Sequence, residues 1–366
     1  MFEFTFHMPT SIIVGRSCLV KNSLRLREFG KKCLIITGQT SSKLNGSLED
    51  SILALENENI KYVIFDKIEE TPTLSTVEKA YRENKEKGID FILAVGGGSA
   101  IDAAKAISIL FKHDISKEEL LSRKNLKGIP IVAVPTTAGT GSEANPYSIL
   151  AMPEEGVNKN IGQQVFPVLA FLDARYTLNM SYELTVCTAV DAFSHLAEGY
   201  LNTRANLFTD TLAEKGLRLF GECIEPLKNM DCNIDMREKL LLASTIGGMV
   251  ISHTGTSLPH GMGYPLTYEK NIPHGVANGI LYPGYLKVFK KCDKLKRMLS
   301  LINVSSVEEL SSILQKILPM KPLTLTQEEI RRYVNGLLSN EKKLKNHPEK
   351  VSRDDLIKIY KTILTP

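Results

Sequence analysis

The segment FILAVGGGSAIDAAKAISILFKH, residues 91–113, decides the fold of this chain of 366 residues. A short apolar run passes through three glycines into a stretch with helical spacing, which predicts a buried strand followed directly by a helix. The residues around it alternate in the same way: strands are predicted for KCLIITG (32–38), KYVIFD (61–66) and IPIVAVPTT (129–137), and helices for SLEDSILALENEN (47–59) and STVEKAYRENKEKG (75–88). Such alternation predicts a parallel α/β sheet, whose ligands bind at the carboxyl ends of the strands.

The second half of the chain has a different pattern. After about residue 180 the strand signals end, and apolar residues recur at helical spacing. The clearest stretches are LTVCTAVDAFSHLAEGYL (184–201), TDTLAEKGLRLFGECIEPL (209–227), MREKLLLASTIGGMVIS (236–252) and VEELSSILQKIL (307–318). We therefore expect two domains, an α/β domain over 1–180 and a helical domain over 181–366.

The composition narrows the class of protein. Hydrophobic residues make up 43% and charged residues 23% of the chain, and the net charge of +4 is spread without a basic stripe. This predicts a globular protein that binds no nucleic acid. No apolar run approaches a membrane span, and the N-terminus lacks the features of a signal peptide. Six scattered cysteines without a CxxC pair favour reduced thiols and a cytoplasmic location.

Four residues between positions 191 and 274 have the chemistry of metal ligands. Asp191 and His195 are spaced i, i+4, so on a helix both side chains leave the same face. His260 and His274 each stand in a Pro-His-Gly triplet, which predicts a turn that aims the imidazole inward. Three imidazoles and one carboxylate can complete the ligand set of Fe(II) or Zn(II).

The alternative for any single histidine is a hydrogen-bonded core residue. Clustering argues against it, because four of the seven histidines (His195, His253, His260 and His274) fall in this stretch. The pattern leaves the place of His253 open. It also leaves open whether Glu198 orients an imidazole or is a solvated helix residue. We expect ordinary surface or loop positions for His7, His113 and His347, and a solvated helix end for EKKLKNHPEK (341–350).

Two polar loops follow predicted strands. Gly96, Gly97, Gly98 and Ser99 join a strand to a helix start, where free N–H groups and small residues suit a pyrophosphate. Ser99 and Asp102 also match the S-x-x-D capping pattern, so the alternative is a well-capped turn with nothing bound. The second loop, PTTAGTGSE (135–143), adds Thr136, Thr137 and Thr140. Together the loops predict a cradle for a phosphorylated cofactor, although GxGxxG is absent.

Five motifs together resemble the iron-containing (group III) alcohol dehydrogenase family. They are GGGSAID (96–102), PTTAGTGSE (135–143), DAFSHLAEGY (191–200), PHGMGYPL (259–266) and PHGVANGI (273–280), in the family's order. The resemblance spans about residues 5 to 362. It implies a dinucleotide-binding α/β domain, an all-α domain, and a divalent metal, iron rather than zinc, in the cleft between them. It further implies NAD(P)-dependent interconversion of small alcohols with aldehydes or ketones, and a homodimer.

Two departures from the family's pattern carry information. Many NAD-using members have an Asp where this chain has Gly38, followed by Gln39, Ser41 and Ser42. Without that carboxylate, a 2′-phosphate meets no repulsion, so NADP(H) is favoured over NAD(H), with Lys43 as a possible cation. Many relatives also have a second histidine where this chain has Tyr264. A phenol is a poor base at neutral pH, so we expect Tyr264 to line the pocket and His253 to be a candidate for proton transfer.

The expected chemistry is hydride transfer. A metal held by Asp191, His195, His260 and His274 would polarise the substrate oxygen while hydride passes to or from the nicotinamide. Two other hypotheses stay open: a metal- and NAD-dependent lyase or cyclase of the dehydroquinate synthase type, which shares this architecture, and a non-catalytic NADP-binding protein. Segment 244–280 contains Lys270 as its only cation other than histidine, which favours a neutral alcohol or aldehyde over a multiply charged substrate.

Overall fold

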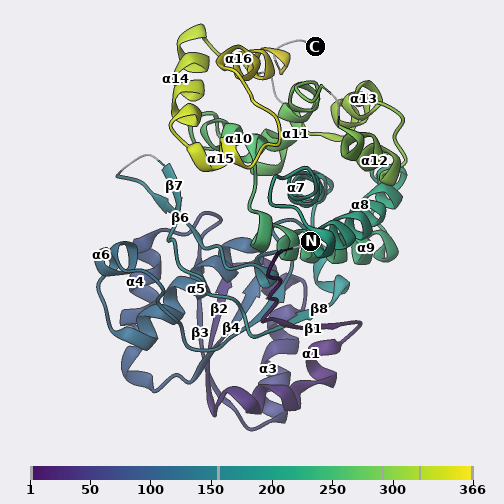
Figure 1. Cartoon of the computed structure of the whole chain (residues 1–366). Helices are drawn as coiled ribbons and strands as arrows, with labels where there is room; N and C mark the ends of the chain where they lie inside the picture. The colour runs from purple at the N-terminus through teal and green to yellow at the C-terminus, as the bar shows by residue number, and fades with distance from the viewer. Residues whose placement is uncertain (1–2, 155–156, 291, 321–322, 364–366) are drawn as a thin grey trace. The chain divides into compact units, whose positions relative to one another are not determined.

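The computed structural model describes residues 3–154, 157–290, 292–320 and 323–363. The chain divides into two compact units (Figure 1). One comprises His7–Met180, and the other comprises Ser181–Pro366 together with Met1–Phe6. We call them the α/β unit and the helical unit.

A six-stranded sheet forms the centre of the α/β unit. Its strand order is β1-β8-β5-β4-β2-β3, and all its pairings are parallel. The strands are β1 (Ser11–Val14), β2 (Lys32–Gly38), β3 (Lys61–Ile68), β4 (Phe91–Gly96), β5 (Ile131–Pro135) and β8 (Leu169–Leu172). Strands β4, β5 and β8 are buried at every residue, as expected for a parallel sheet with both faces covered.

Helices cover the two faces of this sheet. The main ones are α3 (Ser47–Asn57), α4 (Leu74–Arg82) and α5 (Gly98–His113), with the shorter α1 (Cys18–Lys21), α2 (Ser41–Leu44) and α6 (Lys117–Ser122). Ile35 and Leu93 share a buried cluster with Leu55 of α3. The alternate strand residues, such as Ile36 and Ala94, point to the other face, and α5 packs against β4, β2 and β5.

The strand order creates a switch point between β2 and β4. The chain passes from β2 to its neighbour β3, and then returns to the opposite side of β2 as β4. Helices that leave two such strands lie on opposite faces, so their connections diverge and leave a crevice at the carboxyl edge. Gly38 ends β2 and Gly96 ends β4. The topology therefore assigns a ligand crevice to the ends of these two strands.

Three short strands of this unit lie outside the predicted pattern. They are β8 and the antiparallel pair β6 (Ile149–Met152) and β7 (Val157–Asn160). All three have only four residues, too few to show a clear period. The first strand, β1, begins at Ser11. Before it, Phe4 and Phe6 contact Phe208 of the helical unit edge to face, at centroid distances of 5.2 and 5.6 Å.

The helical unit contains ten α-helices among the described residues. They are α7 (Tyr182–Tyr200), α8 (Leu207–Lys228), α9 (Ile234–Thr254), α10 (Leu258–Lys270), α11 (His274–Leu286), α12 (Asp293–Leu301), α13 (Val307–Ile317), α14 (Gln327–Leu338), α15 (Glu341–Lys345) and α16 (Arg353–Thr362). Helix α7 packs against α8, α9 and α11, and every residue from Ala189 to Tyr200 is buried. It is therefore the central helix of this unit (Figure 1).

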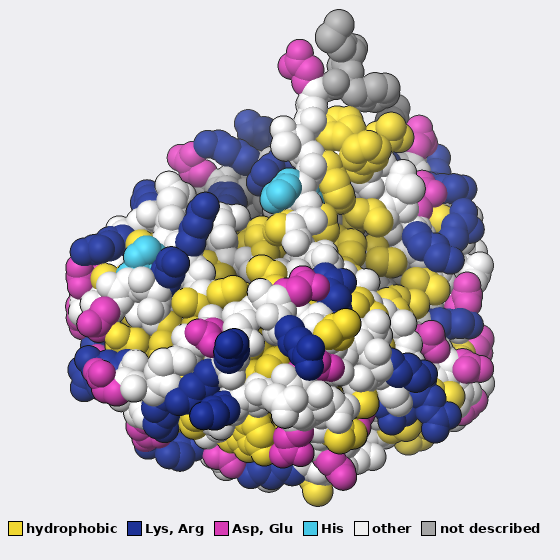
Figure 2. All heavy atoms as spheres, turned by 90° about the horizontal axis from the view of Figure 1, so that it is seen from below, with side chains coloured by type: hydrophobic (Ala, Val, Ile, Leu, Met, Phe, Trp, Pro, Cys, Tyr) yellow, Lys and Arg dark blue, Asp and Glu magenta, His cyan; other side chains and the backbone are white. Residues whose placement is uncertain are grey.

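The surface shows no segregation by charge on the face drawn in Figure 2, where cationic and anionic side chains are interspersed. This pattern accords with the small net charge of +4. Among the helices of the described residues, none is both long and apolar enough to cross a membrane.

Candidate metal centre

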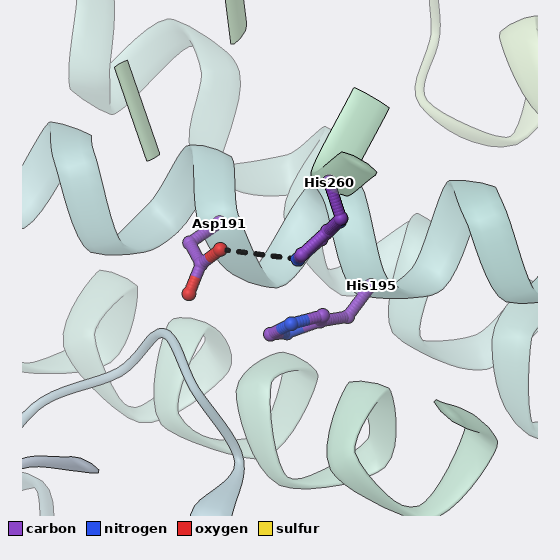
Figure 3. Close-up of side chains that lie close together, drawn as sticks. All are labelled: Asp191, His195 and His260. Atoms are coloured by element: carbon purple, nitrogen blue, oxygen red, sulfur yellow. Dashed lines mark ion pairs between the residues drawn. The ribbon is translucent and has the colours of Figure 1, made fainter. Parts of the chain in front are cut away.

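Helix α7 presents Asp191 and His195 toward one point. The helix begins where the Ser181 side chain accepts a hydrogen bond from the Leu184 N–H, and its Ala-rich middle lets neighbours approach closely. With His260, the two residues place one ligand atom each within 4.8 Å of one another (Figure 3). The i, i+4 spacing thus brings a carboxylate and an imidazole together.

His260 and His274 come from the first turns of two further helices. Pro259 lies in the first turn of α10, and Pro273 is the N-cap of α11, whose first residue is His274. The expectation of Pro-His-Gly turns is therefore corrected, because proline fixes a φ that suits a helix start. Gly275 allows the close packing, since a Cβ there would lie 1.9 Å from the Cys187 carbonyl oxygen.

The separations among these donors suit a single divalent ion. The Asp191 Oδ1 atom lies 3.7 Å from His260 Nε2 and 3.8 Å from His274 Nε2. One ion bound at about 2.0–2.2 Å from two donors requires them to lie within about 4.4 Å of each other. The His195 and His260 rings stack at 4.7 Å between centroids. Asp191, His195 and His260 therefore converge, with His274 beside them, as nitrogen and oxygen donors of the kind that hold iron or zinc.

Asn278 marks the point of convergence. Its Nδ2 lies 3.3 Å from His274 Nε2, 3.4 Å from His260 Nε2 and 3.4 Å from Asp191 Oδ1. The Asn278 Oδ1 atom is buried without a hydrogen-bond partner. The Asn278 amide is thus a point that His274, His260 and Asp191 all face.

Glu198 orients His260, which resolves the alternative left open by the sequence. The glutamate is fully buried, and its Oε1 lies 2.5 Å from His260 Nδ1. Its Oε2 accepts a hydrogen bond of 2.5 Å from the Ser257 N–H. A proton held on Nδ1 by this carboxylate leaves the Nε2 lone pair free to face Asp191. Glu198 is thus a partner of the site and not a solvated helix residue.

Burial favours the neutral form of His260 and His274. Burial lowers the pKa of His260 well below its ordinary value, and the nearby His195 lowers it further. Burial likewise lowers the pKa of His274 to about 4. Neutral imidazoles are the metal-binding form, so the cluster is prepared to accept a cation. Burial raises the pKa of Glu198 to about 7, while the charge of Lys343 opposes that rise.

Tyr264 lies beside the cluster, and the contacts of His253 lie elsewhere. The Tyr264 ring stacks on His274 at 5.5 Å, and it lines a cavity of about 260 Å³. The His253 ring stacks on Phe6 at 4.3 Å, and its Nδ1 lies 2.9 Å from the Met249 carbonyl oxygen. These contacts tie His253 to its own helix and to the N-terminal segment, so we leave it out of the proposed site.

The expectation for His347 was wrong. His7 and His113 are exposed, but His347 is only 4% exposed and packs against Phe289 at 4.6 Å. Both of its ring nitrogens are buried without a hydrogen-bond partner. Burial lowers its pKa to about 4. A polar, lysine-rich sequence gave no sign that this residue turns inward.

The two polar loops of the α/β unit pack against each other. A Cβ at Gly97 would lie 3.1 Å from the Thr137 side chain, and one at Gly98 would lie 2.6 Å from Thr140. The Thr136 N–H donates to the Gly96 carbonyl oxygen at 3.0 Å. The loops thus meet beside the start of α5, which offers backbone N–H groups to a phosphate.

Ser99 and Asp102 do not form the expected cap. The N-cap of α5 is Gly97, without a side-chain cap, so Ser99 lies inside the helix and donates to the Glu70 carbonyl oxygen. Asp102 accepts hydrogen bonds from the Ser142 hydroxyl and from the Ile149 N–H, the latter at 2.9 Å. The predicted capping pattern is corrected, because the glycines let the helix begin two residues earlier.

The residues after β2 divide into two groups. Gln39 and Ser41 are exposed beside Gly38, at the edge to which the topology assigns a ligand. Ser42 is fully buried, and its hydroxyl oxygen accepts a hydrogen bond of 2.7 Å from Thr37, so we leave it out of the proposed cofactor contacts. Lys43 forms a 2.6 Å ion pair with Asp66, which shares its charge.

The sequence analysis missed Asn278 and Lys343. Asn278 stands four residues after His274, and that spacing could have indicated it once a helix was assumed. Lys343 lies in the run EKKLKNHPEK, and no signal in that run separates it from its solvated neighbours.

Two family models match the chain. The model described as iron-containing alcohol dehydrogenase matches residues 9–174. The model described as the C-terminal part of the Fe-containing alcohol dehydrogenase family matches residues 185–364. The two matches together cover both units.

Individual relatives agree with these models. A crystal structure of an iron-containing alcohol dehydrogenase from Thermotoga maritima superposes with a TM-score of 0.90 at 38% identity, covering 99% of each chain. Lactaldehyde reductase of Escherichia coli is 32% identical over 263 residues, which are 70% of this chain and 68% of the relative. NADPH-dependent butanol dehydrogenase of Clostridium saccharobutylicum is 26% identical over 99% of this chain and 98% of its own length.

Proposed function

Because this chain belongs to the iron-containing alcohol dehydrogenase family of oxidoreductases, we propose that it transfers a hydride between NADP(H) and a small alcohol or aldehyde. The observation that carries the proposal is the buried convergence of Asp191, His195 and His260, with His274 beside them. We propose these four residues as the ligands of one Fe(II) or Zn(II) ion.

Each residue of the centre has a distinct task in this proposal. A bound divalent ion supplies Lewis acidity to the substrate oxygen. Asp191 contributes the negative charge that favours a cation in a buried place, and Glu198 holds the His260 proton on Nδ1. Tyr264 stacks on His274 at 5.5 Å, and in this proposal its ring shapes the substrate pocket.

We assign dinucleotide binding to the α/β unit. Gly96, Gly97 and Gly98 at the start of α5 suit the pyrophosphate, and the adjoining Thr137 and Thr140 supply hydroxyls. Asp102, whose carboxylate is fixed by Ser142, and Thr136 complete the proposed contacts.

The preference for NADP(H) rests on the end of β2. Gly38 places no carboxylate there, so a 2′-phosphate meets no repulsion from that position. Gln39 and Ser41 are exposed donors next to it. The clostridial relative is named as an NADPH-dependent enzyme, which is in line with this choice.

Two further parts of the proposal concern the protein in the cell. We infer a reducing compartment, the cytoplasm, because all six cysteines are free. We also propose a homodimer, an expectation that comes from the family resemblance alone.

Removing the metal tests the proposal. A chelator should abolish NADPH oxidation with short aldehydes, and Fe(II) or Zn(II) should restore it. Binding of NADPH, followed by its fluorescence, should survive chelation because the proposed dinucleotide contacts contain no metal ligand. Full activity in a preparation shown to be metal-free would overturn the proposal.

A further inference from the structure

Lys343 turns inward from a lysine-rich helix. It lies in α15, whose other lysines, Lys342 and Lys345, are exposed. Its Nζ donates to the Thr256 hydroxyl and lies 5.9 Å from the centroid of the Tyr264 ring. Its stem packs toward Gly261, where a Cβ would lie 3.4 Å from Lys343 Cγ. Lys343 therefore belongs to the surroundings of α10 and not to the solvated face of its own helix.

Tyr264 lies near both the proposed ligand His274 and the Lys343 ammonium group. The His274 side chain keeps 33% of its surface accessible, in contrast to His260 with 3%. Tyr264 stacks on His274 at 5.5 Å, and Lys343 follows at 5.9 Å from the Tyr264 ring. Tyr264 and Lys343 are also only partly buried. Tyr264 therefore lies within reach of both a proposed metal ligand and the Lys343 cation, and a short substrate aligned along Tyr264 would meet both.

Among the described residues, Lys343 has no direct carboxylate partner, unlike the neighbouring cations Lys270 and Arg332. Lys270 pairs with Glu329 at 2.6 Å and Arg332 with Glu269 at 2.5 Å. In the part of the chain that the structure describes, no carboxylate lies within 4.0 Å of Lys343 Nζ. Burial lowers the pKa of Lys343 to about 8, and the charge of Glu198 opposes that lowering. Both Glu198 oxygens are already engaged, one by Ser257 and one by His260. The ammonium group is thus available to a further anion.

We propose that Lys343 is a specificity-determining residue that selects alcohols and aldehydes bearing a carboxylate at the end remote from the reacting carbon. The inference rests on the proposed function and narrows its substrate class. It departs from the expectation of a neutral substrate. That expectation counted cations only within segment 244–280, whereas the fold brings Lys343 in from α15. A charge-assisted hydrogen bond in a sheltered place discriminates strongly against a substrate that lacks the anion.

Two four-carbon aldehydes, 4-oxobutanoate and butanal, test the proposal on the metal-loaded, full-length protein. Their kcat/KM values are compared for the wild type, Lys343→Met and Lys343→Arg. Lys345→Met is the matched control, because Lys345 lies on the same helix and is 74% exposed. Metal content and circular dichroism are recorded for each protein, and thermal shift with 4-hydroxybutanoate against 1-butanol gives a binding readout without turnover.

The expected result is a selective loss. Lys343→Met should lower the preference for 4-oxobutanoate over butanal, taken as the ratio of their kcat/KM values, by about tenfold or more. Most of this loss should arise through KM, and the thermal shift from 4-hydroxybutanoate should disappear. Lys343→Arg should keep most of the preference, and Lys345→Met should match the wild type.

Three other outcomes would contradict the proposed role of Lys343. An equal loss with both aldehydes in Lys343→Met would show that Lys343 only supports the Glu198 region. A ratio unchanged in that variant would show that Lys343 does not select the substrate, while activity with butanal would leave the proposed function intact. Reduction of neither aldehyde by the wild type would contradict the proposed function, and with it this inference.

Discussion

The metal centre and the polar loops of the sheet are built from different parts of the chain. In the centre, side chains converge: Asp191 and His195 from α7 meet His260 from α10. In the loops, backbone predominates, because Gly97 and Gly98 pack so closely on Thr137 and Thr140 that side chains are excluded. A substitution in the centre therefore removes a donor outright. In the loops, only added bulk or added charge should be felt.

Removal of a proposed ligand should have the largest effect. His260→Ala should lower the metal content and reduce kcat by about a thousandfold or more, because the Lewis acid is lost. Metal analysis and steady-state rates measure both. His113→Ala is the matched control, since His113 is exposed and contacts the Lys127 carbonyl oxygen. Normal metal content and rate in His260→Ala would show that the ligand set is misassigned.

Neutralising Glu198, whose carboxylate contacts the proposed ligand His260, should have the next largest effect. Glu198→Gln keeps the shape of the side chain but removes the charge that holds the His260 proton on Nδ1. We expect metal affinity to fall by about 10- to 100-fold, measured by competition with a chelator. Glu214→Gln, at an exposed pair with Arg297, should leave the affinity unchanged. An unaltered metal affinity in Glu198→Gln would mean that the Glu198 contact with His260 does not contribute to metal binding.

A negative charge added at the end of β2 should change the preference between NADP(H) and NAD(H). Gly38→Asp places a carboxylate where β2 ends, and we expect the preference to shift toward NAD(H) by about tenfold or more. The ratio of kcat/KM for NADPH and NADH measures the shift, and metal content should stay constant. A larger kcat/KM with NADH in the unmodified protein would contradict the proposed preference.

A buried histidine outside the centre shows what burial alone does. The pKa of His347 is lowered from about 6.5 to about 4, so between these pH values the unfolded chain takes up a proton that the folded chain refuses. Stability should fall as pH drops through this window, by on the order of 3 kcal/mol. His347→Gln should flatten this fall in urea midpoints without changing metal content. If the urea midpoints of the wild type and His347→Gln fell equally with pH, His347 would not be the source of the pH dependence.

Tyr264 should show the smallest effect on rate. Tyr264→Phe keeps the ring that stacks on His274 and should stay within about tenfold of the wild-type kcat. Tyr264→Ala should instead alter which alcohols are used, because it removes the ring that packs on the proposed ligand His274. A loss of about a thousandfold or more in Tyr264→Phe, with metal still bound, would make the hydroxyl catalytic.

The contrast between side chains and backbone also explains what the sequence could predict. The α/β and helical classes, the glycine-rich helix start at 96–98 and the Asp191–His195 pair followed from period, residue type and spacing. The first turns around Pro259 and Pro273 were taken for simple turns, since a proline signal marks both.

The sequence could not predict which residues of a polar segment turn inward. Lys343 and His347 lie in a run of charged residues, and their inward direction depends on contacts with Thr256 and Phe289 far away in the chain. The same holds for Ser42, whose hydroxyl turns to Thr37. Local composition predicts exposure for such residues, and tertiary contacts decide otherwise.

The most direct test of the central claim is anomalous X-ray diffraction at the iron and zinc edges from crystals of anaerobically purified, active protein. We predict one peak per chain at about 2.0–2.2 Å from the Asp191 carboxylate and the nearest nitrogens of His195, His260 and His274. An active protein whose anomalous peak lies away from these four residues, or that shows no peak, would contradict the account.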